Sequence, residues 1–181
     1  MRASRTDIPD VLLLEPSIFR DERGSFVESW NARTFRNVVQ SDVEFVQDNE
    51  SRSARSVLRG LHYQIKQPQG KLIHVPRGRI FDVAVDLRKS SPTFGRWLGL
   101  ELSEDNHRQL WIPPGFAHGF FVLSDIADVL YKTTDYYAPE HERCVIWNDP
   151  TLAINWPVKG EPVLSAKDRL GLPLSKAEVF A

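Results

Sequence analysis

Ile80-Phe81-Asp82-Val83-Ala84-Val85-Asp86-Leu87 has the two-residue alternation of a β-strand. Successive side chains of a β-strand point to opposite faces, so the apolar odd-numbered positions share one face, whereas Asp82, Ala84 and Asp86 share the other. A barrel that encloses a small ligand can turn such a partly polar face toward its lumen. A strand with one solvated face accounts for the same alternation equally well.

The rest of the chain repeats this short-strand pattern between glycines and prolines. Helical patterns are confined to residues 32–40, which follow the N-cap candidate Asn31, and to residues 103–108, where a short helix or helical turn is expected. Many short strands and few helices predict an all-β fold, a barrel or double-sheet jelly roll. The expected strands are residues 11–14, 43–46, 71–75, 80–87, 97–102, 119–123 and 129–133.

The chain has 181 residues, which is enough for one domain with a substantial core and too few for two domains of usual size. No fixed-period repeat, low-complexity tract or Ser/Gly linker marks a boundary. We therefore expect a single domain over residues 1–181. The Pro-bearing tail, residues 157–173, is expected to wrap on the barrel as irregular structure.

Composition limits the partners and the compartment. Lys and Arg total 23 against 24 Asp and Glu, so the chain has no global basic field of the kind that nucleic-acid binding needs. The single cysteine, Cys144, excludes an internal disulfide and a Cys-based zinc cluster and fits a reducing compartment, so the cytoplasm is expected. The apolar run at residues 11–14 is far shorter than a signal sequence or a membrane span.

The chemistry-bearing residues gather in three short segments. Residues 57–64 carry Arg59, a permanent cation suited to phosphate or carboxylate, and His62, which can transfer protons near neutral pH. Lys71 follows shortly after, and His118 lies among glycines and aromatics. These side chains predict proton chemistry on an anionic small molecule. Lys71 could hold a developing oxyanion, although an ordinary surface lysine would look the same in sequence.

The spacing Pro113-x-Gly115-x-x-His118 resembles the second motif of the cupin superfamily, whose members are jelly rolls and often bind a metal. A cupin metal site also needs a His-x-His pair and a Glu, but Gln64 stands where the second of these histidines would be. Only His62 and His118 remain as plausible ligands, fewer than zinc or iron requires. We predict no metal. Surface or strand-edge positions are expected for the other histidines, His74, His107 and His141.

A series of short segments spans nearly the whole chain: residues 19–24 with Phe26 and Glu28, 45–49, 58–64, 69–72, 81–88, 91–95, 108–113, 115–119, 130–139 and 165–168. In these segments the chain is similar to the dTDP-4-dehydrorhamnose 3,5-epimerase family. The resemblance implies an isomerase that epimerises C3 and C5 of dTDP-4-dehydro-6-deoxy-D-glucose to give dTDP-4-dehydro-L-rhamnose, without a cofactor. It also implies a cupin-type barrel.

The same resemblance implies a set of catalytic residues. The base corresponds to His62, the carboxylate that orients it to Asp168, the acid on the opposite side of the sugar to Tyr131, and the cation that neutralises the enolate at C4 to Lys71. Read locally, Asp168 would be a tail aspartate paired with Lys167. Tyr131 would equally fit a core-facing strand tyrosine.

Residues that bind the nucleotide sugar are implied in the same way. Arg23 and Arg59 suit the diphosphate, since guanidinium groups bind phosphate through bidentate hydrogen bonds, and Tyr137 would stack on the thymine. Polar residues after a strand often only cap a turn, which is the alternative for Gln47 and Asn49. The remaining expected contacts are Glu28, His118, Glu142 and Lys167.

Two other functions stay open at the level of sequence. One is a relative that epimerises a single carbon, or moves the keto group, of another dTDP-deoxysugar. The other is a sugar-nucleotide-binding cupin without catalysis, although a binder has no use for a base, an acid and an oxyanion cation together. The resemblance further implies a homodimer in which an N-terminal strand crosses to the partner sheet. The apolar residues 11–14 are a candidate interface strand, and an ordinary core strand explains them equally well.

Overall fold

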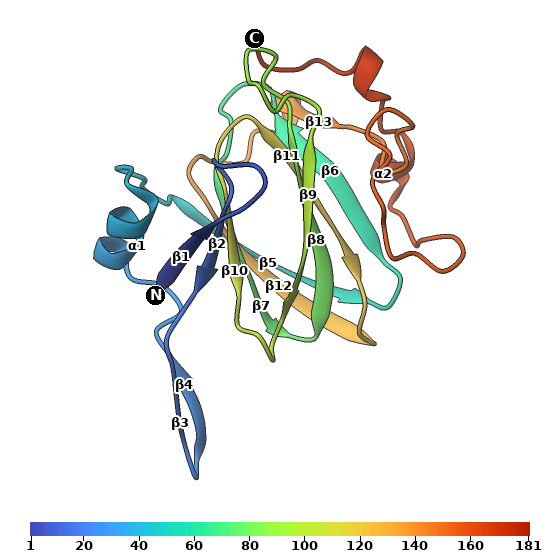
Figure 1. Cartoon of the computed structure of the whole chain (residues 1–181). Helices are drawn as coiled ribbons and strands as arrows, with labels where there is room; N and C mark the ends of the chain where they lie inside the picture. Colours follow the sequence, from blue (N-terminus) through green and yellow to red (C-terminus); the bar gives the residue numbers. More distant parts are fainter.

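A computed structural model describes all 181 residues. Two antiparallel sheets face each other around a barrel interior, in the orders β1-β2-β10-β7-β12-β5 and β13-β6-β11-β8-β9 (Figure 1). The first sheet comprises β1 (Arg2–Arg5), β2 (Leu12–Glu15), β10 (Gln109–Ile112), β7 (Lys71–Arg77), β12 (Ile126–Thr133) and β5 (Gln47–Ala54). The second comprises β13 (Glu142–Cys144), β6 (Leu58–Gln64), β11 (Phe116–Val122), β8 (Arg79–Asp86) and β9 (Trp97–Ser103). This confirms the all-β jelly roll.

The alternation that the sequence shows at residues 80–87 is realised in β8. Asp82 and Asp86 are fully buried on the face that carries Ala84 into the main core cluster. On the other face, Val83 and Val85 pack in a second cluster beneath the C-terminal tail. Both faces are covered, so the expectation of a polar position inside the barrel is confirmed and the alternative of a solvated face is wrong.

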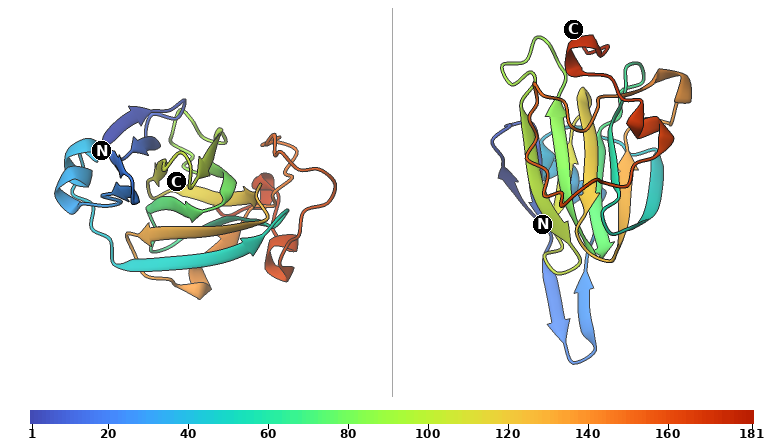
Figure 2. Two further views of the ribbon diagram at one scale, coloured as in Figure 1. Left: turned by 90° about the horizontal axis from the view of Figure 1, so that it is seen from below. Right: turned by 90° about the vertical axis from the view of Figure 1, so that its right-hand side faces the viewer.

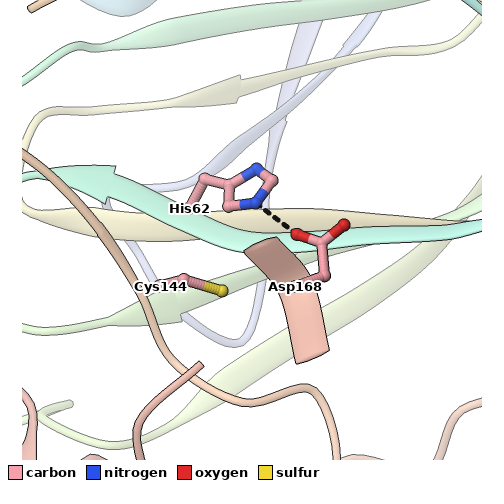
Figure 3. A group of neighbouring side chains, drawn as sticks. All are labelled: His62, Cys144 and Asp168. Atoms are coloured by element: carbon pink, nitrogen blue, oxygen red, sulfur yellow. Dashed lines mark hydrogen bonds and ion pairs between the residues drawn. The ribbon is translucent and has the colours of Figure 1, made fainter. Parts of the chain in front are cut away.

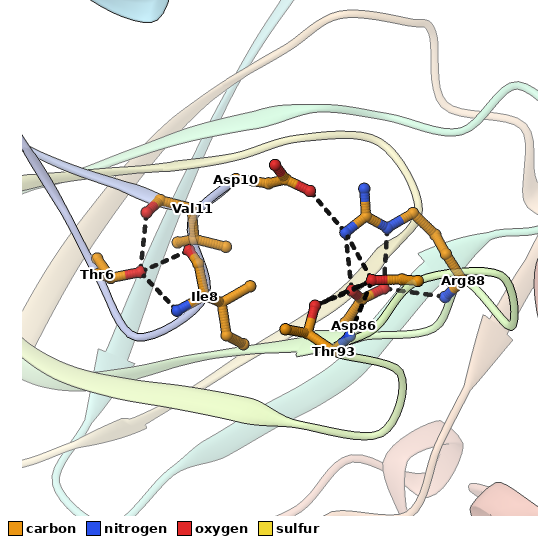
Figure 4. Close-up of polar contacts among 8 residues, drawn as sticks. Thr6, Ile8, Asp10, Val11, Asp86, Arg88 and Thr93 are labelled. Carbon is orange, nitrogen blue, oxygen red and sulfur yellow. Dashed lines mark hydrogen bonds and ion pairs between the residues drawn. The ribbon is translucent and has the colours of Figure 1, made fainter.

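Asp86 shows how a buried carboxylate is accommodated at one end of the barrel (Figure 4). It accepts hydrogen bonds from Arg88 and Thr93, and the same guanidinium pairs with Asp10 in the N-terminal segment at 2.8 Å. Burial raises the pKa of Asp86, but these hydrogen bonds outweigh it and hold the pKa at about 2. The group stays charged, and its partners connect the N-terminal segment to β8.

The expected helix is α1 (Ala32–Val39), whose first turn is capped by the Asn31 side chain accepting from the amide of Thr34. Within residues 103–108 there is no helix, but a single helical turn follows β9, closed by the amide of His107 donating to the carbonyl of Ser103, so the expected helical turn is present. Residues 43–46, expected as a strand, have no regular structure. The largest omission is β5, which pairs with β12 along its whole length although it has almost no apolar residues.

The C-terminal tail is mostly irregular and packs across the second sheet, as expected (Figure 2). Its one α-helix, α2 (Ala166–Arg169), is four residues long, and Ser165 caps it by accepting from the amide of Asp168. Short 3-10 turns lie at Pro139–His141 and Leu174–Lys176. No helix of the molecule has the length and apolar character needed to cross a membrane.

A two-stranded hairpin, β3 (Ile18–Asp21) and β4 (Gly24–Val27), projects away from the barrel (Figures 1 and 2). Phe19 and Phe26 face each other in its ladder and are 62% and 69% exposed. An isolated two-stranded hairpin is marginally stable in water. Large exposed aromatic side chains on such an arm are typical of a surface that contacts another molecule.

Candidate active site

A cavity of about 340 Å³ opens between the two sheets. All of the side chains predicted for the site line it except Arg23, Glu28, Lys167 and Asp168. Its walls come from β5, β6, β7, β11, β12 and β13, so residues far apart in sequence meet there. The lining residues are Gln47, Asn49, Ser51, Arg59, His62, Tyr63, Gln64, Gln69, Lys71, His118, Gly119, Phe120, Tyr131, Tyr137 and Glu142.

A bulge in β6 brings Arg59 and His62 to the same side. In a regular strand, residues three apart point to opposite faces. Here His62 pairs with His118 while Arg59 pairs with Phe120, so β6 carries one extra residue between them. Gly60 occupies the bulge with φ +108°, and a Cβ there would lie 2.6 Å from the Cα of Gly119. Only glycine fits this close approach of β6 to β11.

His62 and Asp168 form a hydrogen-bonded pair, with Nε2 of the ring 2.5 Å from Oδ1 of the carboxylate (Figure 3). The carboxylate is buried and also accepts from the Ser165 hydroxyl at 2.7 Å. Burial raises the pKa of Asp168, but the bonds from His62 and Ser165 outweigh it, so the net shift is downward. A carboxylate held at Nε2 keeps the ring proton there and leaves Nδ1 with a free lone pair. The local alternative is wrong, because Lys167 pairs with Glu142 instead.

Lys71 is a buried cation without a carboxylate partner. It begins β7, its residue is 7% exposed, and it takes part in no salt bridge of the molecule. Burial lowers its pKa to about 8, and the charge of Glu142 partly opposes that shift. The alternative of an ordinary surface lysine is wrong. An unpaired cation facing a cavity is suited to an anionic group that enters it.

Tyr131 lies on β12, on the face shared with Val129 and Thr133, and it both lines the cavity and packs against the main core cluster. Burial raises the pKa of its hydroxyl, and Arg59 opposes that shift. The group therefore stays protonated at neutral pH and can donate a proton. The Tyr131 side chain therefore faces both the core and the cavity, so the two interpretations of this tyrosine are compatible.

Polar residues form a connected network at one side of the cavity. The hydroxyl of Tyr137 donates to Glu142 at 2.6 Å, and Lys167 pairs with the same carboxylate. Gln47 donates to Asn49 at 2.8 Å and accepts from the backbone amide of Tyr137. Gln47 and Asn49 are thus strand residues of β5 and do not cap a turn. Tyr137 is 52% exposed, which leaves its ring open to a planar ligand.

His118 is held by a second buried carboxylate. Its Nε2 lies 2.7 Å from Oδ1 of Asp82, and both side chains are nearly inaccessible to solvent. The other carboxylate oxygen of Asp82 has no hydrogen-bond partner. His74, expected at a surface or strand edge, lies half-buried on β7 in the middle of its sheet.

Two predicted site residues lie away from the cavity of this chain. Arg23, at the tip of the β3–β4 hairpin, pairs with Asp21, and its side chain is 85% exposed. Glu28 follows the hairpin and accepts from the Asn31 side chain. Neither reaches the cavity from its own chain.

The sequence interpretation missed several lining residues, because they carry no motif. Ser51 follows Gln47 and Asn49 at every second position of β5, and its buried hydroxyl has no hydrogen-bond partner. Gln64 donates to the backbone carbonyls of Gln67 and Tyr136 and thereby fixes the segment before Tyr137. The alternation of residues in β5 would have placed Ser51 on the same face as Gln47 and Asn49 if a strand had been predicted there.

In the sequence Cys144 is only an unpaired thiol, but the fold brings it to the site. It lies opposite His62 in the β13–β6 ladder, and potential ligand atoms of Cys144, His62 and Asp168 lie within 4.8 Å of one another. Burial raises the pKa of this thiol to about 12. The motifs from which the absence of a metal was predicted include neither Cys144 nor Asp168, and that absence stays a prediction.

Comparison with known proteins gives a consistent result. The model of the dTDP-4-dehydrorhamnose 3,5-epimerase family matches residues 5–176. A Pseudomonas aeruginosa protein named dTDP-4-dehydrorhamnose 3,5-epimerase is 61% identical over 180 residues, which cover 99% of either chain.

Solved structures extend the similarity to the fold. The dTDP-6-deoxy-D-glucose-3,5-epimerase of Legionella pneumophila, in complex with dTDP-4-keto-L-rhamnose, superposes with a TM-score of 0.96 at 51% identity, covering 98% of this chain and 94% of that one. A 3'-monoepimerase from Streptomyces bikiniensis, in complex with dTDP-quinovose, gives 0.89 at 35% identity, covering 97% and 88%.

Proposed function

This chain belongs to the dTDP-4-dehydrorhamnose 3,5-epimerase family, and on that premise we propose that it epimerises C3 and C5 of dTDP-4-dehydro-6-deoxy-D-glucose to give dTDP-4-dehydro-L-rhamnose. The observation that carries the proposal is the hydrogen-bonded pair of His62 and Asp168 on a cavity that Lys71 and Tyr131 also line. These groups supply a base, its orienting carboxylate, an oxyanion cation and an acid.

The first step is proton abstraction next to the C4 ketone. The free lone pair at Nδ1 of His62 takes the proton from C3 or C5 of the sugar. The C–H electrons form a double bond to C4, and the electrons of the C4 carbonyl move to its oxygen, which becomes negatively charged. Asp168 stabilises the imidazolium that forms, as a carboxylate does behind a histidine base. Lys71 neutralises the enolate oxygen, and a preorganised charge of this kind contributes about a hundredfold to a thousandfold in rate.

The second step returns a proton to the opposite face. The hydroxyl of Tyr131 donates to the carbanionic carbon while the enolate collapses to the ketone, which inverts the configuration. The C4 ketone acidifies both C3 and C5, so one set of side chains can act at the two carbons in turn. His62 and Tyr131 then exchange protons with water, which restores both groups.

The nucleotide is proposed to lie along the polar network beside the sugar. Arg59 donates to Ser53 and lines the cavity, where its guanidinium can bind the diphosphate. Tyr137 offers an exposed ring for stacking on the thymine. Its backbone amide donates to Gln47 and its hydroxyl donates to Glu142, which hold the ring in place. His118, held by Asp82, is proposed to contact the sugar or a phosphate.

We further propose a homodimer in which the β3–β4 hairpin of one chain reaches the cavity of the other. The proposal is supported by the position of Arg23 and Glu28, which the family resemblance assigns to substrate but which lie away from the cavity of their own chain. The exposed Phe19 and Phe26 on the same hairpin supply apolar surface for a partner.

We also propose that residues 1–181 act as one domain in the cytoplasm. The tail packs on the second sheet and contributes Asp168 to the site, so the tail and the barrel form one catalytic unit. The unpaired Cys144 is consistent with a reducing compartment.

Solvent labelling tests the reaction. Purified protein and dTDP-4-dehydro-6-deoxy-D-glucose are incubated in deuterated water, and deuterium at C3 and C5 is followed by NMR and mass spectrometry. We expect label at both carbons, absent with a His62→Ala variant. Label at one carbon would indicate a single-carbon epimerase or keto-isomerase, the alternative that the similarity to a 3'-monoepimerase keeps relevant. No label with the nucleotide still bound would leave a binding protein.

A further inference from the structure

The thiol of Cys144 lies beside the proposed base but has no role in the proposed reaction. Cys144 belongs to the edge strand β13 and sits opposite His62 in the ladder, while Asp168 approaches from α2 beyond that edge (Figure 3). The potential ligand atoms of these three side chains all lie within 4.8 Å of one another. Three elements of the fold thus bring a sulfur, a nitrogen and an oxygen donor together.

Thiolate, imidazole and carboxylate are the donor types of zinc sites. Ligand atoms around a tetrahedral zinc ion lie about 3.5 Å apart, given bond lengths of about 2.0–2.3 Å. Nε2 of His62 and Oδ1 of Asp168 are 2.5 Å apart, and no pair of ligand atoms exceeds 4.8 Å, so side-chain rotations of about 1.3 Å or less bring the three atoms to that arrangement. The side chain of His62 is 31% exposed, which gives an ion a route from the cavity.

We propose that His62, Cys144 and Asp168 form an inhibitory site for a thiophilic divalent cation of the zinc class. The ion takes the place of the proton between Nε2 of His62 and Oδ1 of Asp168, and the third ligand is the Cys144 thiolate. The thiol proton is released to solvent, and the ring proton moves from Nε2 to Nδ1. Nδ1 then has no lone pair, so the ring cannot accept a proton from the sugar. The inhibition rests on the proposed role of His62, whereas the metal binding does not.

Cobalt and zinc test the site directly. Wild-type protein is titrated with Co²⁺, and we expect a thiolate-to-cobalt charge-transfer band that saturates at one ion per chain and disappears when Zn²⁺ is added. A Cys144→Ser variant should lack the band and bind Zn²⁺ more than about tenfold more weakly by calorimetry. Calorimetry in buffers of different ionisation enthalpy should show one proton released per ion for wild type. No charge-transfer band, or a band that Cys144→Ser retains, would overturn the site.

Activity then tests the inhibition. Zn²⁺ should abolish solvent labelling of the substrate by wild type, and a chelator should restore it. Cys144→Ser should keep its basal activity and require more than about tenfold more Zn²⁺ for the same inhibition. Equal inhibition of the two proteins, or full activity of the cobalt-loaded wild type, would refute the inhibitory role. A protein that shows the band but never labels the substrate would retain the metal site and lose the proposed epimerase function instead.

Discussion

Nε2 of His62 lies 2.5 Å from Oδ1 of Asp168, although 106 residues separate the two in the chain. The contact exists because the tail returns across the second sheet and its short helix α2 ends beside β6. The contact fixes the ring proton at Nε2 and leaves Nδ1 with a free lone pair. The proposed base thus depends on a segment that has no local sign of catalysis.

Replacement of Asp168 by Asn should slow catalysis far more than it weakens substrate binding. The amide preserves the shape but removes the charge that stabilises the imidazolium, so we expect kcat to fall by about a hundredfold to ten-thousandfold with KM little changed. Ser165→Ala is the matched control, since it removes the hydroxyl that caps α2 and donates to the same carboxylate but leaves the charge of Asp168 in place. It should cost about tenfold or less in kcat. Comparable losses in both variants would argue for a purely structural role of the tail.

Replacement of Tyr131 by Phe should separate proton exchange from inversion. His62 can still remove and return a proton on its own face, so deuterium should enter the substrate with retained configuration. Net epimerisation should fall by about a hundredfold or more, the usual contribution of a positioned acid. NMR of the recovered nucleotide sugar distinguishes retained from inverted label. Inverted product at the wild-type rate would exclude Tyr131 as the acid.

The pH dependence of kcat/KM should report the ionisation of Lys71. Burial lowers its pKa to about 8, so the free enzyme loses this cation as the pH rises through that value and the rate should decline. The charge of Glu142 opposes this lowering. Glu142→Gln should therefore move the descending limb to lower pH, whatever it does to the rate itself. If the descending limb of the kcat/KM profile stays at the same pH, the ionisation belongs to a group other than Lys71.

The same burial predicts that Lys71→Met makes the protein more stable and less active. The pKa of Lys71 is about 8 when folded against an ordinary value of 10.5, so at pH 7 the folded state carries a cost of about 3 kcal/mol for its charge. Between these pH values the unfolded chain binds more protons, and wild-type stability should rise with pH relative to the variant. Urea unfolding at pH 7 and pH 10 measures both effects. A destabilised Lys71→Met protein at pH 7 would contradict the cost.

Mixing two inactive variants tests whether the hairpin serves the partner. Arg23→Ala should impair the hairpin and His62→Asn the base, so a mixed dimer has one cavity with an intact base and an intact partner hairpin. Random mixing should recover about a quarter of wild-type activity, since half of the dimers are mixed and half of their sites work. His62→Asn mixed with Asp168→Asn is the control, because both changes affect the chain's own cavity. Recovered activity in the control mixture, or no recovered activity in the mixture of Arg23→Ala and His62→Asn, would refute the exchange of hairpins between chains.

Several features of the site followed from sequence because the signal was local. The alternation at residues 80–87 predicted one polar strand face and left open whether it faced the barrel interior or solvent; Asp82 and Asp86 are buried on it. The N-cap Asn31 marked the start of α1. Strand β5 was missed, because its cavity face is polar and its stability comes from the ladder with β12 instead of from apolar periodicity.

The strand-rich barrel could be predicted from local patterns in the sequence, and the family resemblance indicated the side chains of the site. How those side chains meet depends on the tertiary structure. The extra residue at the β6 bulge turned Arg59 and His62 to one face, and the returning tail brought Asp168 to His62. Hydrophobic alternation acts between neighbours in the chain, so it is visible in sequence. A bulge register and a contact across 106 residues depend on the packing of whole sheets, which no local pattern encodes.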